Sequence, residues 1–438
     1  MTEHRVAFAP SGRSIHVVAG TTVLDAARTA GVDIDSTCGG RGLCGRCQIV
    51  PTDDAGLNGW TTVEEGYRGR RPLLDGHRLG CAAAICGDVT VDVPTASQVH
   101  QPVVTKSVGR GALDGVAIDP MVKLHYVELP PAELGAEIGG LREQITMALT
   151  ADFGVTPTEI DAHVLAMLAP AVAAGGRTVT VAIRRGGTIC GVHPGYADRA
   201  LGIAVDVGST TIAGHVVDLT DGEVLATAGR MNPQIRFGDD LMSRVSYVMM
   251  NEGGDVALTT TIREGLDDLV AELLASADAT RHDVYDMVLV GNPVMHHVLL
   301  GIDPTPLGQA PFMLATDGPV TAPASAFDLD APFAEVHLLP CIAGHVGADT
   351  AGAILAEGPH RTSELQLLVD VGTNAEIVLG DERRLFAASS PTGPAFEGAQ
   401  ISAGMRATAG AIERVRIDRD TLEPRLRVIG ADAWSDEP

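Results

Sequence analysis

The sequence predicts a multidomain α/β protein, and three observations support this fold class. The chain has 438 residues, more than one ordinary hydrophobic core holds. Strand-like alternation and helix-like spacing of apolar residues follow each other along it. A polar stretch punctuated by Pro and Gly divides it, which indicates a linker or an extended segment packed on the next domain. We expect domains at residues 1–97, 120–200 and 201–438, with a linker at 98–119.

The first domain begins with a predicted hairpin and helix. Residues 5–8 and 14–18 are short β-like runs separated by a Pro-Ser-Gly turn. Two threonines then precede residues 23–30, whose apolar spacing is helical, and Gly31 ends this run. The cysteine-rich loop and further strand-like residues follow. This order predicts a small β-rich domain with one helix against its sheet.

Three cysteines share one Gly-rich loop. Cys38, Cys44 and Cys47 follow the pattern C-x5-C-x2-C, and Cys81 comes later in an apolar turn. Four thiolates suit a 2Fe-2S cluster, and glycines let backbone N–H groups approach a small anionic object. Zinc is the competing metal, but its sites usually have two separated C-x2-C pairs, so the loop favours the cluster. Cys86 begins an alternating strand, and we expect it to be buried.

The charge of the chain limits its partners. Lys and Arg number 31 and Asp and Glu number 56, so the net charge is 31 − 56 = −25. This charge argues against non-specific binding to nucleic acid or to anionic membranes. No secretory signal and no apolar run long enough to span a membrane is present in the sequence. We therefore expect a cytoplasmic protein.

The region at residues 120–200 predicts a small α/β domain that positions its neighbours, because no group of chemically active side chains stands out there. We expect strands at 122–127, 178–183 and 188–192, and helices at 134–149 and 159–168.

At residue 201 the sequence changes to an apolar strand, a tight turn and a second strand. The first strand ends in Asp206, and the turn contains Gly208, Ser209, Thr210 and Thr211. Hydroxyls and backbone N–H groups of such a turn surround a point where a phosphate fits, and a carboxylate there binds hydrated Mg²⁺. The turn is therefore a candidate phosphate site, although one copy alone is a weak signal.

A second copy of this strand-turn-strand pattern makes the signal stronger. It has an apolar strand ending in Asp370, followed by Gly372, Thr373 and Asn374. Two such copies, each on an apolar strand, are a much stronger signal for phosphate binding than one copy alone.

A shorter passage between the two hairpins has a structural interpretation. Asn292 and Pro293 are expected to be a helix cap and the first helical residue. His296 and His297 are adjacent, so they point to different faces of that helix, and we expect no shared metal site.

The N-terminal pattern resembles plant-type and, more closely, adrenodoxin-type 2Fe-2S ferredoxins. The resemblance covers residues 1–97 and implies a β-grasp fold in which Cys38, Cys44, Cys47 and Cys81 ligate the two irons. The two hairpins resemble those of the actin, sugar kinase and Hsp70 superfamily, whose ribonuclease-H-like lobes clamp ATP. This resemblance implies that both hairpins bind the phosphates of one nucleotide, and that Asp206 or Asp370 orients the attacking water, with the choice between them open. That superfamily has a Gly-containing crossing helix between the hairpins, and residues 344–355 have the spacing for it.

The combination resembles the reductive activators of corrinoid proteins over nearly the whole chain, most clearly at residues 292–304, 393–399, 404–407 and 410–413. The resemblance implies one-electron reduction of Co(II) to Co(I) through the 2Fe-2S cluster, coupled to ATP with Mg²⁺. Its implied partners are a corrinoid protein of a methyltransferase system and an upstream electron donor.

One departure concerns the end of the chain. The actin-like superfamily has a further Gly-rich adenosine motif after the second hairpin, and chains of the resembled family continue beyond this point, so we expect the ATPase domain to be incomplete at its C-terminus. This leaves an alternative, a non-catalytic electron carrier or redox-responsive docking protein with a vestigial nucleotide site.

Overall fold

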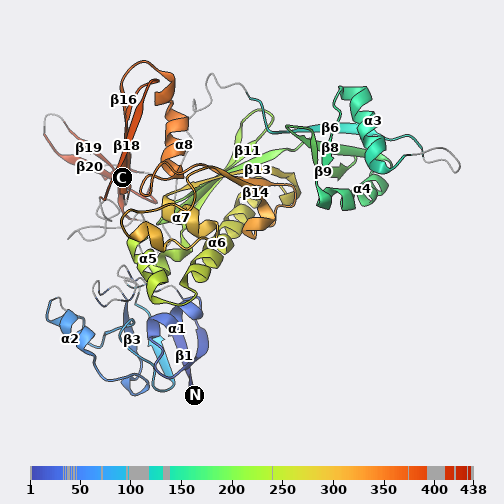
Figure 1. Cartoon of the computed structure of the whole chain (residues 1–438). Helices are drawn as coiled ribbons and strands as arrows, with labels where there is room; N and C mark the ends of the chain where they lie inside the picture. The colour runs from blue at the N-terminus through green and yellow to red at the C-terminus, as the bar shows by residue number, and fades with distance from the viewer. Residues whose placement is uncertain are drawn as a thin grey trace.

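The computed structural model of the chain is shown in Figure 1. The structure describes residues 2–32, 34, 36, 40, 42, 45, 47–70, 73–94, 97, 118–131, 139–238, 240–372, 374–391, 410–418, 421–431 and 433–435. These residues form five sheets with helices packed around them. Across these ranges, every helix is too short or too polar to cross a bilayer.

The N-terminal unit is a five-stranded sheet in the order β2-β1-β5-β3-β4. Its elements are β1 (Glu3–Ala9), β2 (Arg13–Val18), α1 (Val23–Thr29), β3 (Gln48–Pro51), α2 (Thr62–Arg68), β4 (Arg78–Leu79) and β5 (Val89–Asp92). The expected hairpin is β1–β2, and the expected helix is α1. Thr22 caps α1, because its hydroxyl accepts a hydrogen bond from the Asp25 N–H at 3.1 Å. Val6 and Phe8 alternate inward along β1 and pack with Leu24 of α1 in a separate core.

The small α/β unit is a four-stranded sheet in the order β6-β8-β9-β7. Its elements are β6 (Val122–Glu128), α3 (Leu141–Phe153), β7 (Glu159–Ile160), α4 (Ala162–Ala174), β8 (Thr178–Arg184) and β9 (Thr188–Pro194). The three expected strands are confirmed, but both helices begin later than expected. Glu159 and Ile160 pair in parallel with β9 as a short strand, so α4 starts after them. Of the expected helix at 134–149, residues 134–138 lie outside the described part.

The first lobe is a six-stranded sheet in the order β12-β11-β10-β13-β15-β14. Its strands are β10 (Leu201–Val207), β11 (Thr211–Asp218), β12 (Val224–Met231), β13 (Val284–Gly291), β14 (Val320–Pro323) and β15 (Glu335–Leu338), and its helices are α5 (Leu241–Met250), α6 (Gly254–Ser276) and α7 (Pro293–Leu299). Ile262, Leu266 and Leu269 repeat at helical spacing on α6 and are buried in the core of this lobe. β10 and β13 are parallel and end together, with Val207 opposite Gly291. The turns that follow both strands therefore gather at one edge of the sheet.

The second lobe follows α8 (Ala348–Glu357), which contacts both β13 and β16. Its sheet contains β16 (Gln366–Val371), β17 (Asn374–Gly380) and β18 (Leu385–Pro391), and a separate hairpin pairs β19 (Ile412–Ile417) with β20 (Pro424–Val428). Along β16, Leu367, Val369 and Val371 are exposed on one face. Because strand side chains alternate, Asp370 projects from the opposite face.

The units are arranged around the first lobe. Figure 1 shows the N-terminal unit against one end of the first lobe, near α5, and the small α/β unit at the far end of its sheet. The second lobe lies beside α8, on the same side of the molecule as the turns after β10 and β13. The two strand-turn-strand hairpins are thus carried by neighbouring lobes.

Candidate cluster and nucleotide sites

The structure brings Cys47 and Cys81 together across the β3–β4 pair. Cys47 is buried directly before β3, and Cys81 is half-buried shortly after β4. Gln48 of β3 pairs with Leu79 of β4, and the N–H of Gly80 donates to the Cys47 carbonyl at 2.7 Å. The remaining two predicted ligands, Cys38 and Cys44, lie outside the described residues.

The glycines of the cysteine loop are required by the way α2 packs on it. Gly42 and Gly45 have φ of +67° and +68°. A Cβ on Gly42 would lie 2.1 Å from Val63, and one on Gly45 would lie 2.0 Å from the Tyr67 hydroxyl. The described loop residues therefore leave no space for larger side chains and keep the backbone in the left-handed region. They fit the expected task of holding backbone N–H groups against a compact anionic cluster.

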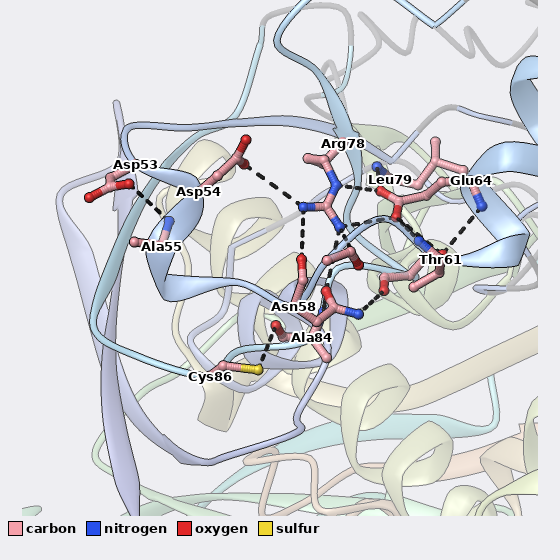
Figure 2. Close-up of polar contacts among 12 residues, drawn as sticks. Asp53, Asp54, Ala55, Asn58, Thr61, Glu64, Arg78, Leu79, Ala84 and Cys86 are labelled. Carbon is pink, nitrogen blue, oxygen red and sulfur yellow. Dashed lines mark hydrogen bonds and ion pairs between the residues drawn. The ribbon is translucent and has the colours of Figure 1, made fainter.

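A buried ion pair connects α2 to the strand before Cys81, as Figure 2 shows. Arg78 Nε donates to Glu64 Oε1 at 2.7 Å, and Nη2 donates to Oε2 at 3.0 Å. The Leu79 N–H also donates to Glu64 Oε1, at 3.2 Å. Burial alone would raise the pKa of Glu64, but hydrogen bonds from Arg78, Thr61 and Leu79 outweigh it and lower the pKa. The pair therefore stays ionised and fixes β4 against α2.

The thiols outside the predicted ligand set differ in exposure. Burial raises the pKa of Cys190 to about 12 and that of Cys341 to about 11, so both are unreactive at neutral pH. The prediction that Cys86 is buried is wrong, because this thiol is exposed. The physical reason is that β5 begins only at Val89, so Cys86 lies in the bend before the strand rather than on its inner face.

The first hairpin is held by two asparagine side chains. Asn232 Nδ2 donates to the Gly208 carbonyl at 2.8 Å, and the Asn232 N–H donates to the Thr210 carbonyl at 2.8 Å. Asn292 Nδ2 donates to Ser209 Oγ at 3.0 Å. The predicted cap is confirmed, since Asn292 Oδ1 accepts from the N–H of Met295 at 3.0 Å. Asn292 thus caps α7 and fixes the hairpin hydroxyl at the same time.

A buried arginine donates a hydrogen bond to a backbone carbonyl of the same hairpin. Arg244 of α5 has no exposed surface. Its Nε donates to the Gly238 carbonyl at 2.9 Å, and its Nη1 contacts Gln234 Oε1 at 3.2 Å and Met295 Sδ at 3.1 Å. Its Nη2 donates to the carbonyl of Ser209. The turn predicted to bind phosphate is therefore fixed from its carbonyl side.

The two predicted aspartates share their surroundings with two further carboxylates. Burial first, and then the charges of Asp206 and Asp370, raise the pKa of Asp349 to about 6. Burial first, and then the charges of Asp349 and Asp370, raise the pKa of Glu376 to about 7, although a hydrogen bond from Ser389 acts in the opposite direction. Asp206 and Asp370 come from different lobes, so the structure brings the two hairpins to one acidic site, in which Asp349 interacts with both.

Close backbone packing explains how Asp349 reaches this site. A Cβ on Gly347 would lie 2.6 Å from the Gly291 carbonyl and 2.6 Å from Asn292 Cα. The start of α8 therefore touches the turn that follows β13. The crossing helix expected at 344–355 is α8, which begins later, at Ala348, and ends at Glu357. Inside this helix, a Cβ on Gly352 would lie 3.4 Å from Val290.

Sequence reasoning missed Asp349 and Glu376. A signal for Glu376 exists, because a hairpin turning at residues 372–373 places it opposite Asp370, as the register shows. Thr373 lies outside the described residues. The described His, Cys, Asp and Glu side chains contain no group of three arranged to hold a metal ion.

Four family models match the chain in order. They are the 2Fe-2S iron-sulfur cluster binding domain at residues 6–86, the RACo linker region at 111–199, the RACo middle region at 201–362, and the C-terminal domain of RACo, the ASKHA domain, at 364–435. The first covers the N-terminal unit, which is a 2Fe-2S domain. The ASKHA match covers the second lobe and confirms the predicted actin-like ATP-binding fold.

Three relatives are similar over long segments. The corrinoid activation enzyme RamQ of Eubacterium limosum is 27% identical over 435 residues, 98% of this chain and 68% of RamQ. The [Co(II) methylated amine-specific corrinoid protein] reductase of Methanosarcina barkeri is 29% identical over 222 residues, 48% of this chain and 40% of the reductase. The solved reductive activator for corrinoid, iron-sulfur protein is 28% identical with a TM-score of 0.62, covering 98% of this chain and 69% of the other. The chain is therefore a homologue of these corrinoid-protein activators, and it joins a 2Fe-2S ferredoxin domain to an ASKHA domain.

Proposed function

We propose that this chain reductively activates corrinoid proteins, by the ATP-dependent, one-electron reduction of Co(II) to Co(I). The observation that carries the proposal is the joining of a 2Fe-2S domain to an acidic site shared by two phosphate-type hairpins. Its homologues bear the names of corrinoid activators and of a Co(II) reductase. We propose an upstream electron donor and a corrinoid protein of a methyltransferase system as partners. We place the activity in the cytoplasm, since free thiols suit a reducing compartment.

We assign the cluster to Cys38, Cys44, Cys47 and Cys81. When bound, it supplies a one-electron donor with a potential near roughly −400 mV, as plant-type clusters do. The chain contributes the geometry: the β3–β4 pair brings Cys47 beside Cys81, and α2 closes the glycine loop over the site. We assign no electron-transfer role to Cys86.

We assign the nucleotide phosphates to the hairpins at residues 208–211 and 372–374. Asp206 and Asp370 bind hydrated Mg²⁺, and one of them orients the attacking water. The charges of both aspartates act on Asp349, so this carboxylate would be placed to accept a proton or to help hold hydrated Mg²⁺. Because the pKa of Asp349 is raised to about 6, a bound Mg²⁺ would favour the ionised form of this carboxylate.

The energetics explain why the two domains would be joined. A one-electron transfer becomes about tenfold less favourable for each ~59 mV by which the acceptor lies below the donor. We expect the Co(II)/Co(I) couple to lie below the cluster, so that unassisted transfer is unfavourable. A nucleotide can shift this equilibrium only if it binds two conformations of the protein with different affinities. The shared acidic site between the lobes is where such a difference would arise.

Cysteine variants test the first half of the proposal. Cys81→Ser should lose the visible and EPR signals of a reconstituted 2Fe-2S cluster, because a ligand is removed. Cys86→Ser is the matched control, since this exposed thiol lies nearby but outside the ligand set. Equal signals in both variants would contradict the assignment.

An activity assay tests the second half. Anaerobic mixing with an oxidised corrinoid protein, a reductant and Mg-ATP should regenerate the Co(I) spectrum, and Asp370→Asn should reduce its extent. Glu382→Gln is the control, because this exposed side chain lies on the next turn of the same sheet. A wild-type yield that is independent of ATP would instead support the electron-carrier alternative.

A further inference from the structure

Arg28 of α1, in the ferredoxin domain, contacts the first lobe. Arg28 Nε donates to the carbonyl of Arg236 at 2.6 Å. Its guanidinium carbon lies 5.9 Å from the ring centre of Phe237 and 5.6 Å from that of Tyr247. The Arg28 side chain is only 9% exposed, so a charged group is buried between two parts of the molecule. Figure 1 shows α1 beside the end of the first lobe that carries α5.

Two features of the contact between Arg28 and the first lobe suit a contact that forms and breaks reversibly. Arg28 is held from its own domain by Asp25, with Nη1 and Oδ1 2.9 Å apart. Its Nη2 is buried and has no hydrogen-bond partner in the part of the chain that the structure describes. A buried guanidinium with an unused donor gains hydration when the domains separate. Interfaces between domains of one chain are by default able to open.

The segment that Arg28 contacts is joined to the first phosphate hairpin. Arg236 and Phe237 belong to the 3-10 helix η3 (Pro233–Phe237). Arg244 donates to Gly238, directly after η3, to Gln234 inside η3 and to the Ser209 carbonyl of the hairpin. A single buried side chain thus touches both the docking segment and the turn assigned to phosphate.

The other side of η3 is held by α6. Gln234 Nε2 donates to the Leu258 carbonyl at 2.9 Å, and Arg236 Nη2 donates to Thr261 Oγ1 at 2.8 Å. Because these two hydrogen bonds hold η3 against α6, we expect η3 to respond as one unit when the Arg28 contact is lost, and its contacts with Arg244 to change with it. The contacts form a continuous series from α1 to Ser209.

We propose that docking of the ferredoxin domain through Arg28 and nucleotide binding at the first hairpin are coupled through η3 and Arg244. The docked domain holds the Arg236 carbonyl, keeps η3 and Arg244 in place and orders the hairpin before the nucleotide arrives. Less ordering is then required on binding, so the docked chain binds nucleotide more tightly. Since coupling is reciprocal, nucleotide favours the docked domain by the same factor. This inference rests on the proposed nucleotide site.

The test compares the cluster-loaded full chain with its Arg28→Ala variant. The variant should bind Mg-ATP about fivefold more weakly, which is the lower end of usual coupling between sites. Amide hydrogen exchange in α1 and η3 should be faster in the variant, and Mg-ATP should slow it in the wild type. Arg70→Ala is the matched control, because the exposed Arg70 side chain donates from Nε to the Gly66 carbonyl, within its own domain. This control should change neither quantity.

The possible results distinguish the coupling, the docking role of Arg28 and the nucleotide site from one another. Equal or tighter Mg-ATP binding by Arg28→Ala, with faster exchange in α1 and η3, would overturn the coupling while leaving the nucleotide site intact. Unchanged exchange in the variant would overturn the docking role of Arg28. A wild-type chain that binds no Mg-ATP would overturn the proposed nucleotide site and this inference together.

Discussion

The acidic site places like charges close together. Asp370 and Glu376 face each other across the β16–β17 pair, where opposed like charges destabilise a hairpin. Asp349 adds a third carboxylate from α8, and Asp206 a fourth from β10. Such an arrangement costs stability in the free protein, and a cation bound there would reduce the repulsion. We infer that these residues serve ligand binding rather than folding.

Glu376→Gln should make the folded chain more stable near neutral pH. The folded pKa is raised from 4.5 to about 7, so the folded chain holds a proton that the unfolded chain has lost. The free energy of unfolding therefore falls as the pH rises from about 4.5 to about 7. Glu376→Gln should remove this pH dependence, and above pH 7 it should raise the free energy of unfolding by about 1–3 kcal/mol. Urea unfolding at about pH 5 and about pH 8 measures both values. An unchanged pH dependence, matching that of Glu382→Gln, would contradict this assignment.

The packing of α2 on the cysteine loop depends on one buried pair of charges. Arg78 is the first residue of β4, three residues before Cys81, and Glu64 lies in the first turn of α2 with no exposed surface. The ring of Trp60 also lies 5.1 Å from the Arg78 guanidinium. The pair therefore determines where two elements meet, which no local propensity of either element specifies.

Arg78→Met should destabilise the ferredoxin domain by about 3–5 kcal/mol, because Glu64 is left buried without its partner. Cluster absorbance should then be lost at lower temperature. Arg68→Met is a matched control, since Arg68 also stacks on Trp60, at 5.0 Å, but makes no ion pair with Glu64 in the described structure. Adding Glu64→Leu to Arg78→Met should recover part of the loss. No difference between the two single variants would refute the role of the ion pair.

The small α/β unit and the first lobe share a core. Tyr285 of β13 and Phe333, just before β15, are buried among the residues of the small unit, and their rings stack 5.8 Å apart. Gly191 of β9 permits this, because a Cβ there would lie 2.8 Å from Tyr285 and 3.2 Å from Phe333. The two units are therefore joined by hydrophobic packing, whereas Arg28 of the ferredoxin domain contacts the first lobe through a hydrogen bond and two aromatic rings.

Phe333→Ala should lower the stability of this shared core by about 3–5 kcal/mol and separate the unfolding of the small unit from that of the first lobe. Differential scanning calorimetry measures this as an additional transition. Phe386→Ala is the control, since Phe386 is 56% exposed on β18 and its removal should have little effect. One unchanged transition in Phe333→Ala would show that the units do not depend on this contact.

The sequence by itself determined the parts of this protein that are local. The cysteine loop, the two hairpins and the Asn292 cap are short patterns. Their geometry depends on residues that are neighbours in the sequence, so the sequence alone is enough to predict them. The three predicted boundaries, after residues 97, 119 and 200, and the roles of the nucleotide residues stay predictions. Only the tertiary structure decided that Asp349 joins Asp206, and that Arg28 meets Arg236. These contacts bring together residues far apart in the chain, and their free energy depends on burial and on neighbouring charges that no local pattern records.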